Sequence, residues 1–157
     1  MTKRSVTHDT FVLERSYPAS PARVFFALSD KQAKAKWFVG PDEWGQDNYE
    51  MDFRVGGKEI NSGGPKGGPV HTFAAIYQDI VPDERIVYTY DMHLDDKRIS
   101  VSLATMELRP EGTGTKLVVT EQGAYLDDFD DPTMRRSGTE DLLDALGKSL
   151  ESTGVSA

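Results

Sequence analysis

Hydrophobic and polar positions alternate along most of the chain in the manner of β-strands. Between residues 49 and 55, for example, Tyr49, Met51 and Phe53 alternate with charged residues, as expected for a strand with one buried face. Turn-forming residues separate such segments,. The predicted strands are 10–17, 49–55, 58–61, 71–80, 85–92, 98–108 and 115–122.

A different period near the C-terminus predicts a long helix over residues 132–152. Asp131-Pro132 has the form of a helix start, with Asp as the N-cap and Pro at the first helical position,. The leucines recur at helical spacing and the charged residues fall largely on the opposite side, so one face must be buried. The apolar stripe consists of Leu142, Leu143, Leu146 and Leu150.

The order of these elements predicts an α+β fold. Two short helices, at 21–28 and 31–37, follow the first strand and are expected to close one end of the sheet,. Hairpins then follow hairpins, so the sheet of about six or seven strands should be antiparallel. We expect it to curve around the C-terminal helix in one domain at 10–152, between flexible ends at 1–9 and 153–157.

Two glycine-containing segments are expected to be loops. Residues 39–48 form the first, and residues 62–69 hold four glycines and two prolines, as in a flexible hairpin loop or a mobile lid,. The stretch from Asp52 to Lys58 does not have the glycine spacing of a phosphate-binding loop. Its Gly56-Gly57 pair favours a turn or a bulge, with Asp52 and Arg54 pairing to neighbouring strands.

Composition narrows the class of protein. The 157 residues carry 18 Lys and Arg against 26 Asp and Glu, a net charge of -8, which disfavours nucleic acid as a partner,. The basic cluster of Lys31, Lys34 and Lys36 is interpreted as the solvated face of a short helix,. Without cysteine, a disulfide scaffold or a thiolate nucleophile is excluded,. No signal peptide or long apolar run is present, so we expect a cytoplasmic protein that does not enter membranes.

Candidate chemistry is sparse. The three histidines, His8, His71 and His93, lack metal-binding spacing, and no cofactor or metal is expected,. His71 begins a strand beside the glycine-rich loop, where it is either a surface residue or a base at the mouth of a pocket. The aspartates of residues 127–131 do not fit a calcium-binding loop and are expected to cap the C-terminal helix,.

Aromatic residues are the remaining signal. Several share inward parity on their strands, as either a solid core or the wall of a cavity would require. The tyrosines favour a cavity, because a buried hydroxyl needs a polar partner. The predicted ligand-binding residues are Trp37, Phe53, Phe73, Tyr77, Tyr88, Tyr90 and Met106, with Thr139 and Leu143 contributed by the helix.

The order of elements and a series of short motifs resemble the AHSA-type family, the homologues of a heat-shock-protein ATPase activator. This family lies within the START-like, birch-pollen-allergen-like SRPBCC superfamily and implies a helix-grip fold over about residues 10 to 150. The matching segments are Glu14-Arg15, Pro21 with Val24-Phe25 and Ala27, Ser29-Asp30, Lys36-Trp37-Phe38, Asp52-Phe53-Arg54-Val55-Gly56-Gly57, Val81-Pro82 with Glu84-Arg85-Ile86-Val87-Tyr88, Leu108 with Pro110, Gly114-Thr115-Lys116-Leu117, and Leu143-Asp144 with Leu146.

The sequence departs from the family pattern at one position. Members usually carry Gly-Trp at the start of the final helix, whereas Gly138 is followed here by Thr139. The missing indole is expected either to enlarge the space beneath the sheet or to let another aromatic residue fill it.

The resemblance implies three alternative functions. The first is a non-enzymatic carrier or sensor that binds a small apolar, lipid-like or aromatic molecule between sheet and helix. The second is a protein-interaction module that regulates a chaperone ATPase, although activating relatives usually have an additional N-terminal domain and only about nine residues precede the first predicted strand. The third is a cyclase- or hydrolase-like enzyme using His71, Glu107 or a tyrosine in the cavity. The protein is expected to be a monomer or homodimer.

Overall fold

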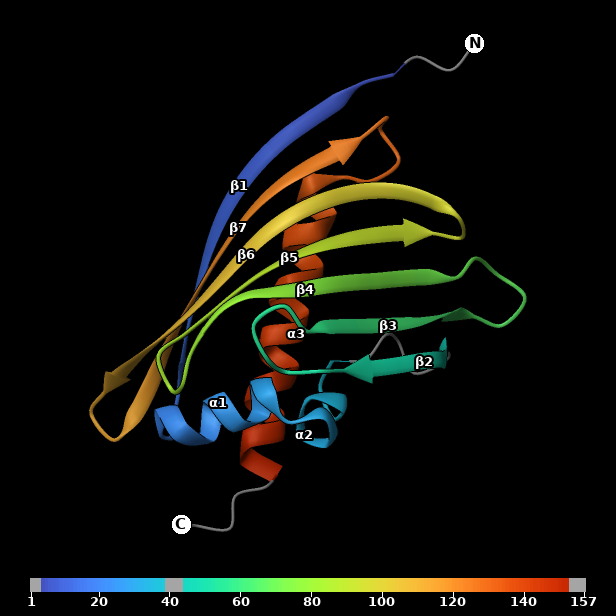
Figure 1. The fold of residues 1–157 in the computed structure, drawn as a ribbon. Helices are drawn as coiled ribbons and strands as arrows, with labels where there is room; N and C mark the ends of the chain where they lie inside the picture. Colours follow the sequence, from blue (N-terminus) through green and yellow to red (C-terminus); the bar gives the residue numbers. More distant parts are fainter. Residues whose placement is uncertain (1–3, 39–43, 153–157) are drawn as a thin grey trace.

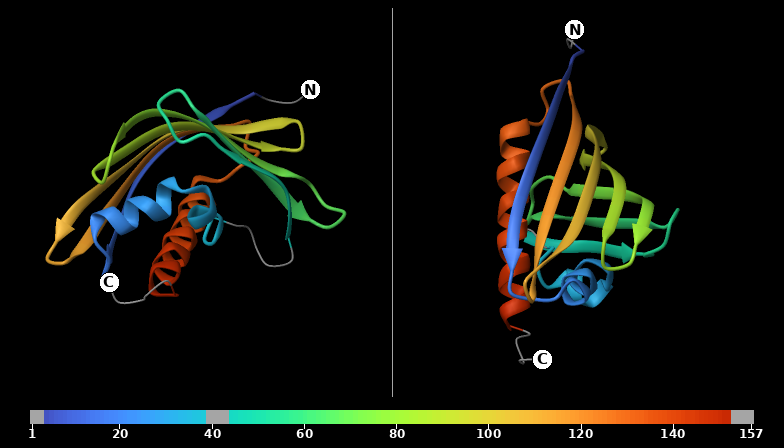
Figure 2. Two further views of the ribbon diagram at one scale, coloured as in Figure 1. Left: turned by 60° about the horizontal axis from the view of Figure 1, so that its bottom comes forward. Right: turned by 90° about the vertical axis from the view of Figure 1, so that its left-hand side faces the viewer.

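A curved antiparallel sheet encloses one face of a long helix (Figures 1 and 2). The structure, a computed structural model, describes residues 4–38 and 44–152. Its seven strands follow the order β1-β7-β6-β5-β4-β3-β2, all antiparallel. The elements are β1 (Val6–Tyr17), α1 (Pro21–Ser29), α2 (Lys31–Ala35), β2 (Trp44–Met51), β3 (Lys58–Pro65), β4 (His71–Val81), β5 (Arg85–Leu94), β6 (Lys97–Glu111), β7 (Gly114–Leu126) and α3 (Pro132–Ser152).

The predicted fold is confirmed. The sheet arches over α3 (Figure 2, left), and α1 and α2 lie at one end of the sheet (Figure 1). Each helix begins at a side-chain cap, because the first backbone N–H groups of a helix lack partners within it. Ser20 accepts from the N–H of Arg23 over 3.2 Å, and Asp131 accepts from that of Thr133 over 2.8 Å. The predicted capping role of the aspartate segment is therefore confirmed at Asp131.

Several strand boundaries differ from the prediction, most of all those of the first three strands. β1 begins at Val6, since residues 6–9 pair with β7 through the backbone although they lack an apolar alternation. β2 begins at Trp44, inside the predicted loop at 39–48, because its first residues pair with β3. It ends at Met51, so Phe53 and Val55 lie in the turn that follows. β3 extends to Pro65, well into the predicted loop at 62–69. The predicted flexible ends at 1–3 and 153–157, and positions 39–43 of the predicted loop at 39–48, lie outside the described residues.

The turn between β2 and β3 depends on its two glycines. Gly56 has a φ of +83°, a conformation that favours glycine, and a Cβ on Gly57 would lie 2.0 Å from the carbonyl oxygen of Asp52,. Gly56 donates to the carbonyl of Tyr77, and the N–H of Tyr77 donates to Gly57. Asp52 and Arg54, which were expected to pair with neighbouring strands, pair with each other over 2.8 Å because both lie in this turn.

The main core lies between one half of the sheet and the three helices. Leu143, Leu146 and Leu150 of α3 are buried there, as the leucine stripe predicts. The hydroxyl of Tyr17 on β1 donates to the carbonyl of Leu143 over 2.7 Å, which fastens α3 to the edge strand. No helix within residues 4–38 and 44–152 is long and apolar enough to cross a membrane.

Candidate functional site

The concave face of the sheet carries two buried polar clusters, and the first is centred on Glu59 of β3. Its side chain is 1 % exposed. Lys34 Nζ lies 2.8 Å from Oε1, and Tyr49 donates to Oε2 over 3.1 Å. Tyr77 donates a short hydrogen bond to Oε1. Both carboxylate oxygens are therefore engaged, as a buried charge requires.

This Glu59 cluster brings together α2, β2, β3 and β4. Lys34 reaches it because α2 folds over the end of the sheet, and its ammonium lies 4.5 Å from the centroid of the Phe38 ring,. Burial, together with the Glu59 carboxylate, raises the pKa of Tyr77 and that of Tyr49,. Both phenols remain protonated donors at neutral pH.

The second cluster is centred on Arg135, in the first turns of α3. Its Nη1 donates to the Tyr90 hydroxyl over 3.0 Å and its Nη2 to Ser100 Oγ over 2.8 Å. Nη2 also forms a short ion pair with Asp130. Glu121, 3 % exposed on β7, accepts from the Tyr90 hydroxyl over 2.9 Å and lies 3.8 Å from Arg135 Nη1. Burial raises the pKa of Glu121 against the opposing effect of the arginine.

A continuous series of aromatic rings joins the two clusters. Phe73 lies 5.0 Å from Phe38 and 4.8 Å from Tyr90, measured between ring centroids. Tyr88 lies 6.2 Å from Tyr77 and 5.9 Å from Tyr90. The rings are close because inward positions of β4 and β5 fall opposite each other in the sheet, as in the pair Tyr77 and Tyr88,.

Tyr88 differs from the other inward tyrosines. Tyr77 and Tyr90 are buried with bonded hydroxyls, whereas the ring of Tyr88 is half-buried. No hydrogen bond within the described part of the chain involves its hydroxyl. Surrounding protein atoms nevertheless raise its pKa through burial, and the Tyr90, Glu121 and Glu59 groups add to that effect. Tyr88 thus lies between the two clusters, enclosed by protein but still accessible.

The nine predicted site residues fall into three groups. Phe73, Tyr77, Tyr88 and Tyr90 form the ring series of the concave face. Phe53 continues it at the α1 end, 4.8 Å from Tyr77 between ring centroids. The others line the core or the helix: Trp37, Met106 and Leu143 belong to the main core, and Thr139 is half-buried on α3.

Trp37 and Thr139 make specific bonds in these positions. The indole N–H of Trp37 donates to the carbonyl of Ala27 over 2.9 Å, which joins α2 to α1. Thr139 donates to the carbonyl of Arg135 over 2.9 Å, one helical turn earlier. Because Arg135, Thr139 and Leu143 are spaced by four residues, Thr139 shares the face of α3 that meets the sheet.

Sequence reasoning missed the charged members of both clusters. Lys34 was interpreted as part of a solvated helix face, but it is 5 % exposed. The interpretation is wrong because Glu59, from a distant strand, supplies its partner. Glu59 and Glu121 occupy inward positions of strands, since their neighbours two residues away are also inward. A carboxylate at an inward strand position could have indicated a buried polar cluster from the sequence alone.

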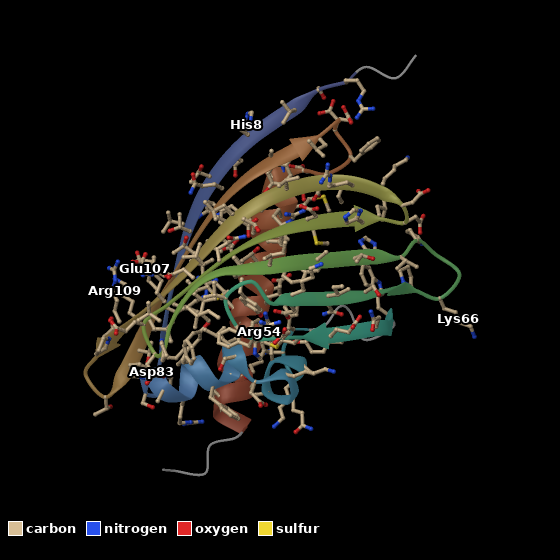
Figure 3. All side chains as sticks on the ribbon, viewed as in Figure 1. His8, Arg54, Lys66, Asp83, Glu107 and Arg109 are labelled. Carbon is tan, nitrogen blue, oxygen red and sulfur yellow. The ribbon has the colours of Figure 1, made fainter. Side chains whose placement is uncertain are left out.

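Other candidate groups lie away from the clusters. His71 stacks on Trp44 with 4.4 Å between ring centroids, and burial lowers its pKa. Glu107 pairs with Arg109 over 3.3 Å on the outside of the sheet, where its side chain is 38 % exposed (Figure 3). No group of three or more metal-ligating side chains occurs in the part of the chain that the structure describes.

Among the hollows on the surface of the described residues are two that contain no predicted site residue. One, of about 320 Å³, lies between α1, α2 and the end of α3 and includes Phe26 and Leu150. The other, of about 560 Å³, is bounded by Trp44, Gly45 and residues 64–70.

The family comparison agrees with the geometry of the helix-grip fold. The family model described as "Activator of Hsp90 ATPase homolog 1-like protein" matches residues 18–151. The chain belongs to this family. Among curated proteins, none matches the chain.

Solved structures of bacterial proteins show the same fold. An uncharacterised protein from Rhizobium leguminosarum is 46% identical, with 96% of this chain and 99% of that chain covered and a TM-score of 0.91. The Mll3558 protein from Rhizobium loti is also 46% identical, with 93% and 99% covered and a TM-score of 0.87. An AHSA1-like protein from Aeromonas hydrophila is 17% identical, with 93% and 94% covered and a TM-score of 0.71. At that identity it shows the fold alone.

Proposed function

We propose that this AHSA1-like protein binds a small, largely apolar or aromatic molecule between the concave face of the sheet and α3. The observation that carries the proposal is Tyr88, a half-buried ring whose hydroxyl has no partner within the described residues. Ligand sites are mostly apolar and aromatic, with a few directed polar groups. The ring series with the free Tyr88 hydroxyl has this composition.

The Glu59 cluster supports binding rather than proton transfer. Both oxygens of Glu59 are already engaged, by Lys34 and by two tyrosine hydroxyls. A catalytic base must present a free oxygen to the proton that it removes. This cluster therefore serves as a rigid frame that holds the aromatic rings in place, and the rings provide the contact area.

The first test is native mass spectrometry of the purified protein, followed by denaturing extraction of any bound molecule. The second is a titration with N-phenyl-1-naphthylamine, an uncharged apolar compound whose fluorescence rises in an apolar site. We expect saturable binding of one molecule per protein. The Tyr88→Ala substitution should weaken the affinity for the probe by about tenfold or more, because a ring contact contributes on the order of 1.4 kcal/mol to binding.

Phe26→Ala is the matched control. Phe26 is 59% exposed and lines the surface hollow between α1, α2 and α3. It should leave the affinity for the probe unchanged. If Phe26→Ala weakens binding and Tyr88→Ala does not, the probe occupies the surface hollow and the proposal is wrong. Absence of saturable binding together with absence of any extracted molecule would also reject it.

A further inference from the structure

Two buried hydroxyls on the concave face have no hydrogen-bond partner among residues 4–38 and 44–152. They belong to Ser102 of β6 and Tyr125 of β7, which are 2 % and 1 % exposed. Burying a hydroxyl without a partner is unfavourable, so such groups in a folded protein call for an explanation. Burial raises the pKa of Tyr125 to about 12, so its phenol carries a proton to donate at neutral pH.

The two hydroxyls share the space above Gly123. Ser102 pairs with Gly123 in the sheet register and with Tyr90 on its other side. A Cβ on Gly123 would lie 3.0 Å from the Tyr125 hydroxyl oxygen, so the tyrosine side chain leans across the glycine. The absence of a side chain at Gly123 therefore leaves room for the Tyr125 hydroxyl next to Ser102, which lies opposite Tyr90 at the end of the aromatic series.

The charges around this space are already balanced. Arg135 interacts with Asp130 and Glu121. An anionic ligand would meet two carboxylates and find the guanidinium occupied. A cationic ligand would have to lose its hydration beside that guanidinium. This desolvation is unfavourable unless a well-placed carboxylate compensates the charge. Lys34 and Glu59 likewise balance each other at the opposite end.

We propose that Ser102 and Tyr125 receive the hydroxyl or carbonyl group of an uncharged ligand whose apolar ring body lies against Tyr88. The inference rests on the proposed function and names the chemical class of the ligand: a neutral aromatic or cyclic compound with one oxygen group at its end. Tyr125 donates to that oxygen, and Ser102 either donates to it or accepts from a ligand hydroxyl.

Equilibrium dialysis with four compounds of one ring system tests this class. The probes are naphthalene, 2-naphthol, 2-naphthoate and protonated 2-naphthylmethylamine. We expect 2-naphthol to bind about three- to tenfold more tightly than naphthalene, because one neutral hydrogen bond contributes about that factor to the affinity. Both charged compounds should bind more weakly than naphthalene because their charges must be desolvated.

Two substitutions assign the preference to the two hydroxyls. Ser102→Ala and Tyr125→Phe keep the shape of each side chain apart from the hydroxyl, and should remove the preference for 2-naphthol while leaving naphthalene binding unchanged. Ser16→Ala is the matched control, because it removes the same hydroxyl from an exposed position on β1, outside both polar clusters. It should keep the preference.

The outcomes separate this inference from the proposed function. If naphthalene binds but 2-naphthol binds no better, or if a charged compound binds best, the ligand class is wrong and the proposed function stands. If Ser102→Ala and Tyr125→Phe retain the preference, another group recognises the naphthol oxygen and the assignment to these two hydroxyls is wrong. If none of the four compounds binds, both proposals fail.

Discussion

Arg135 and Tyr90 are in contact at two points, although 45 residues separate them in the chain. Arg135 Nη1 donates to the tyrosine hydroxyl over 3.0 Å, and the guanidinium carbon lies 5.6 Å from the centroid of the same ring. This contact joins the start of α3 to β5 near the middle of the sheet. Tyr17 joins the same helix to β1 further along, at Leu143. The two attachments fix how far α3 stands from the concave face.

Glu121 should make stability depend on pH. Burial raises its pKa in the folded protein. Its contribution to stability is therefore present below the ordinary glutamate pKa and lost as the pH rises through the folded-state value. Glu121→Gln removes this titration, so the free energy of unfolding of the variant, relative to the parent, should rise as the pH increases above the ordinary glutamate pKa of about 4.3. Urea denaturation at a series of pH values from there upward measures the difference.

Glu14 provides a comparison of opposite sign. Its pKa is lowered by its hydrogen bond and charge interaction with Lys116, so its contribution is present above the ordinary pKa and lost as the pH falls,. Glu14→Gln should therefore change relative stability in the opposite direction, and weakly, because the pair is exposed. A pH-independent difference for Glu121→Gln would show that the carboxyl titrates normally.

Lys34 should be essential to the stability of the fold. Lys34→Met leaves the Glu59 carboxylate buried without its cation, which costs about 3–5 kcal/mol in the free energy of unfolding. The double variant Lys34→Met with Glu59→Gln should recover part of the loss, because no uncompensated charge remains. Arg54→Met breaks an exposed pair with Asp52 and should cost at most about 1 kcal/mol. Urea denaturation of the two single variants and the double variant measures these differences in the free energy of unfolding. Equal losses for Lys34→Met and Arg54→Met would contradict the burial of the pair.

The sequence was sufficient to predict the sheet, the helices and their order, because each depends on a local period. Alternation marks strands such as β5, and the leucines of α3 mark a helix. The predicted end of β2 was wrong for a physical reason. The alternation continues through Phe53 and Val55, but the approach of Gly57 to the Asp52 carbonyl turns the chain first.

The candidate site was predictable only in its apolar part. Inward parity identifies Tyr77, Tyr88 and Tyr90 from the strand period alone. The partners of Lys34 and Arg135 depend on which strands lie beside α2 and α3 in three dimensions. No local sequence pattern predicts this arrangement. A charged side chain on a helix is ordinarily solvated, so the two buried cations appear only once the sheet folds over them.

Gly123 and Gly138 should respond in opposite ways to alanine. A Cβ on Gly123 would lie 2.8 Å from a ring carbon of the buried Tyr125, so Gly123→Ala should cost about 1–3 kcal/mol and displace the ring,. A Cβ on Gly138 meets nothing within 4 Å. Because Gly138 lies inside α3, Gly138→Ala should stabilise the protein by up to about 1 kcal/mol. Thermal and urea unfolding of both variants measures the effects, and a neutral Gly123→Ala would show that Tyr125 moves freely.

Thr139→Trp should close the proposed binding site. Thr139 is half-buried on the face of α3 that also presents Arg135 and Leu143, so an indole at this position enters the space beneath the sheet. We expect the protein to remain folded and its affinity for N-phenyl-1-naphthylamine to fall by about tenfold or more, since the ring competes for the volume that the ligand needs. Calorimetric titration avoids interference from the added fluorophore.

Ser137→Trp is the control for Thr139→Trp, because Ser137 is exposed on α3. It adds the same indole to the same helix and should bind the probe like the parent protein. Urea denaturation of both variants separates loss of binding from loss of folding. If Thr139→Trp is as stable as the parent and binds the probe equally well, the ligand does not lie between α3 and the concave face.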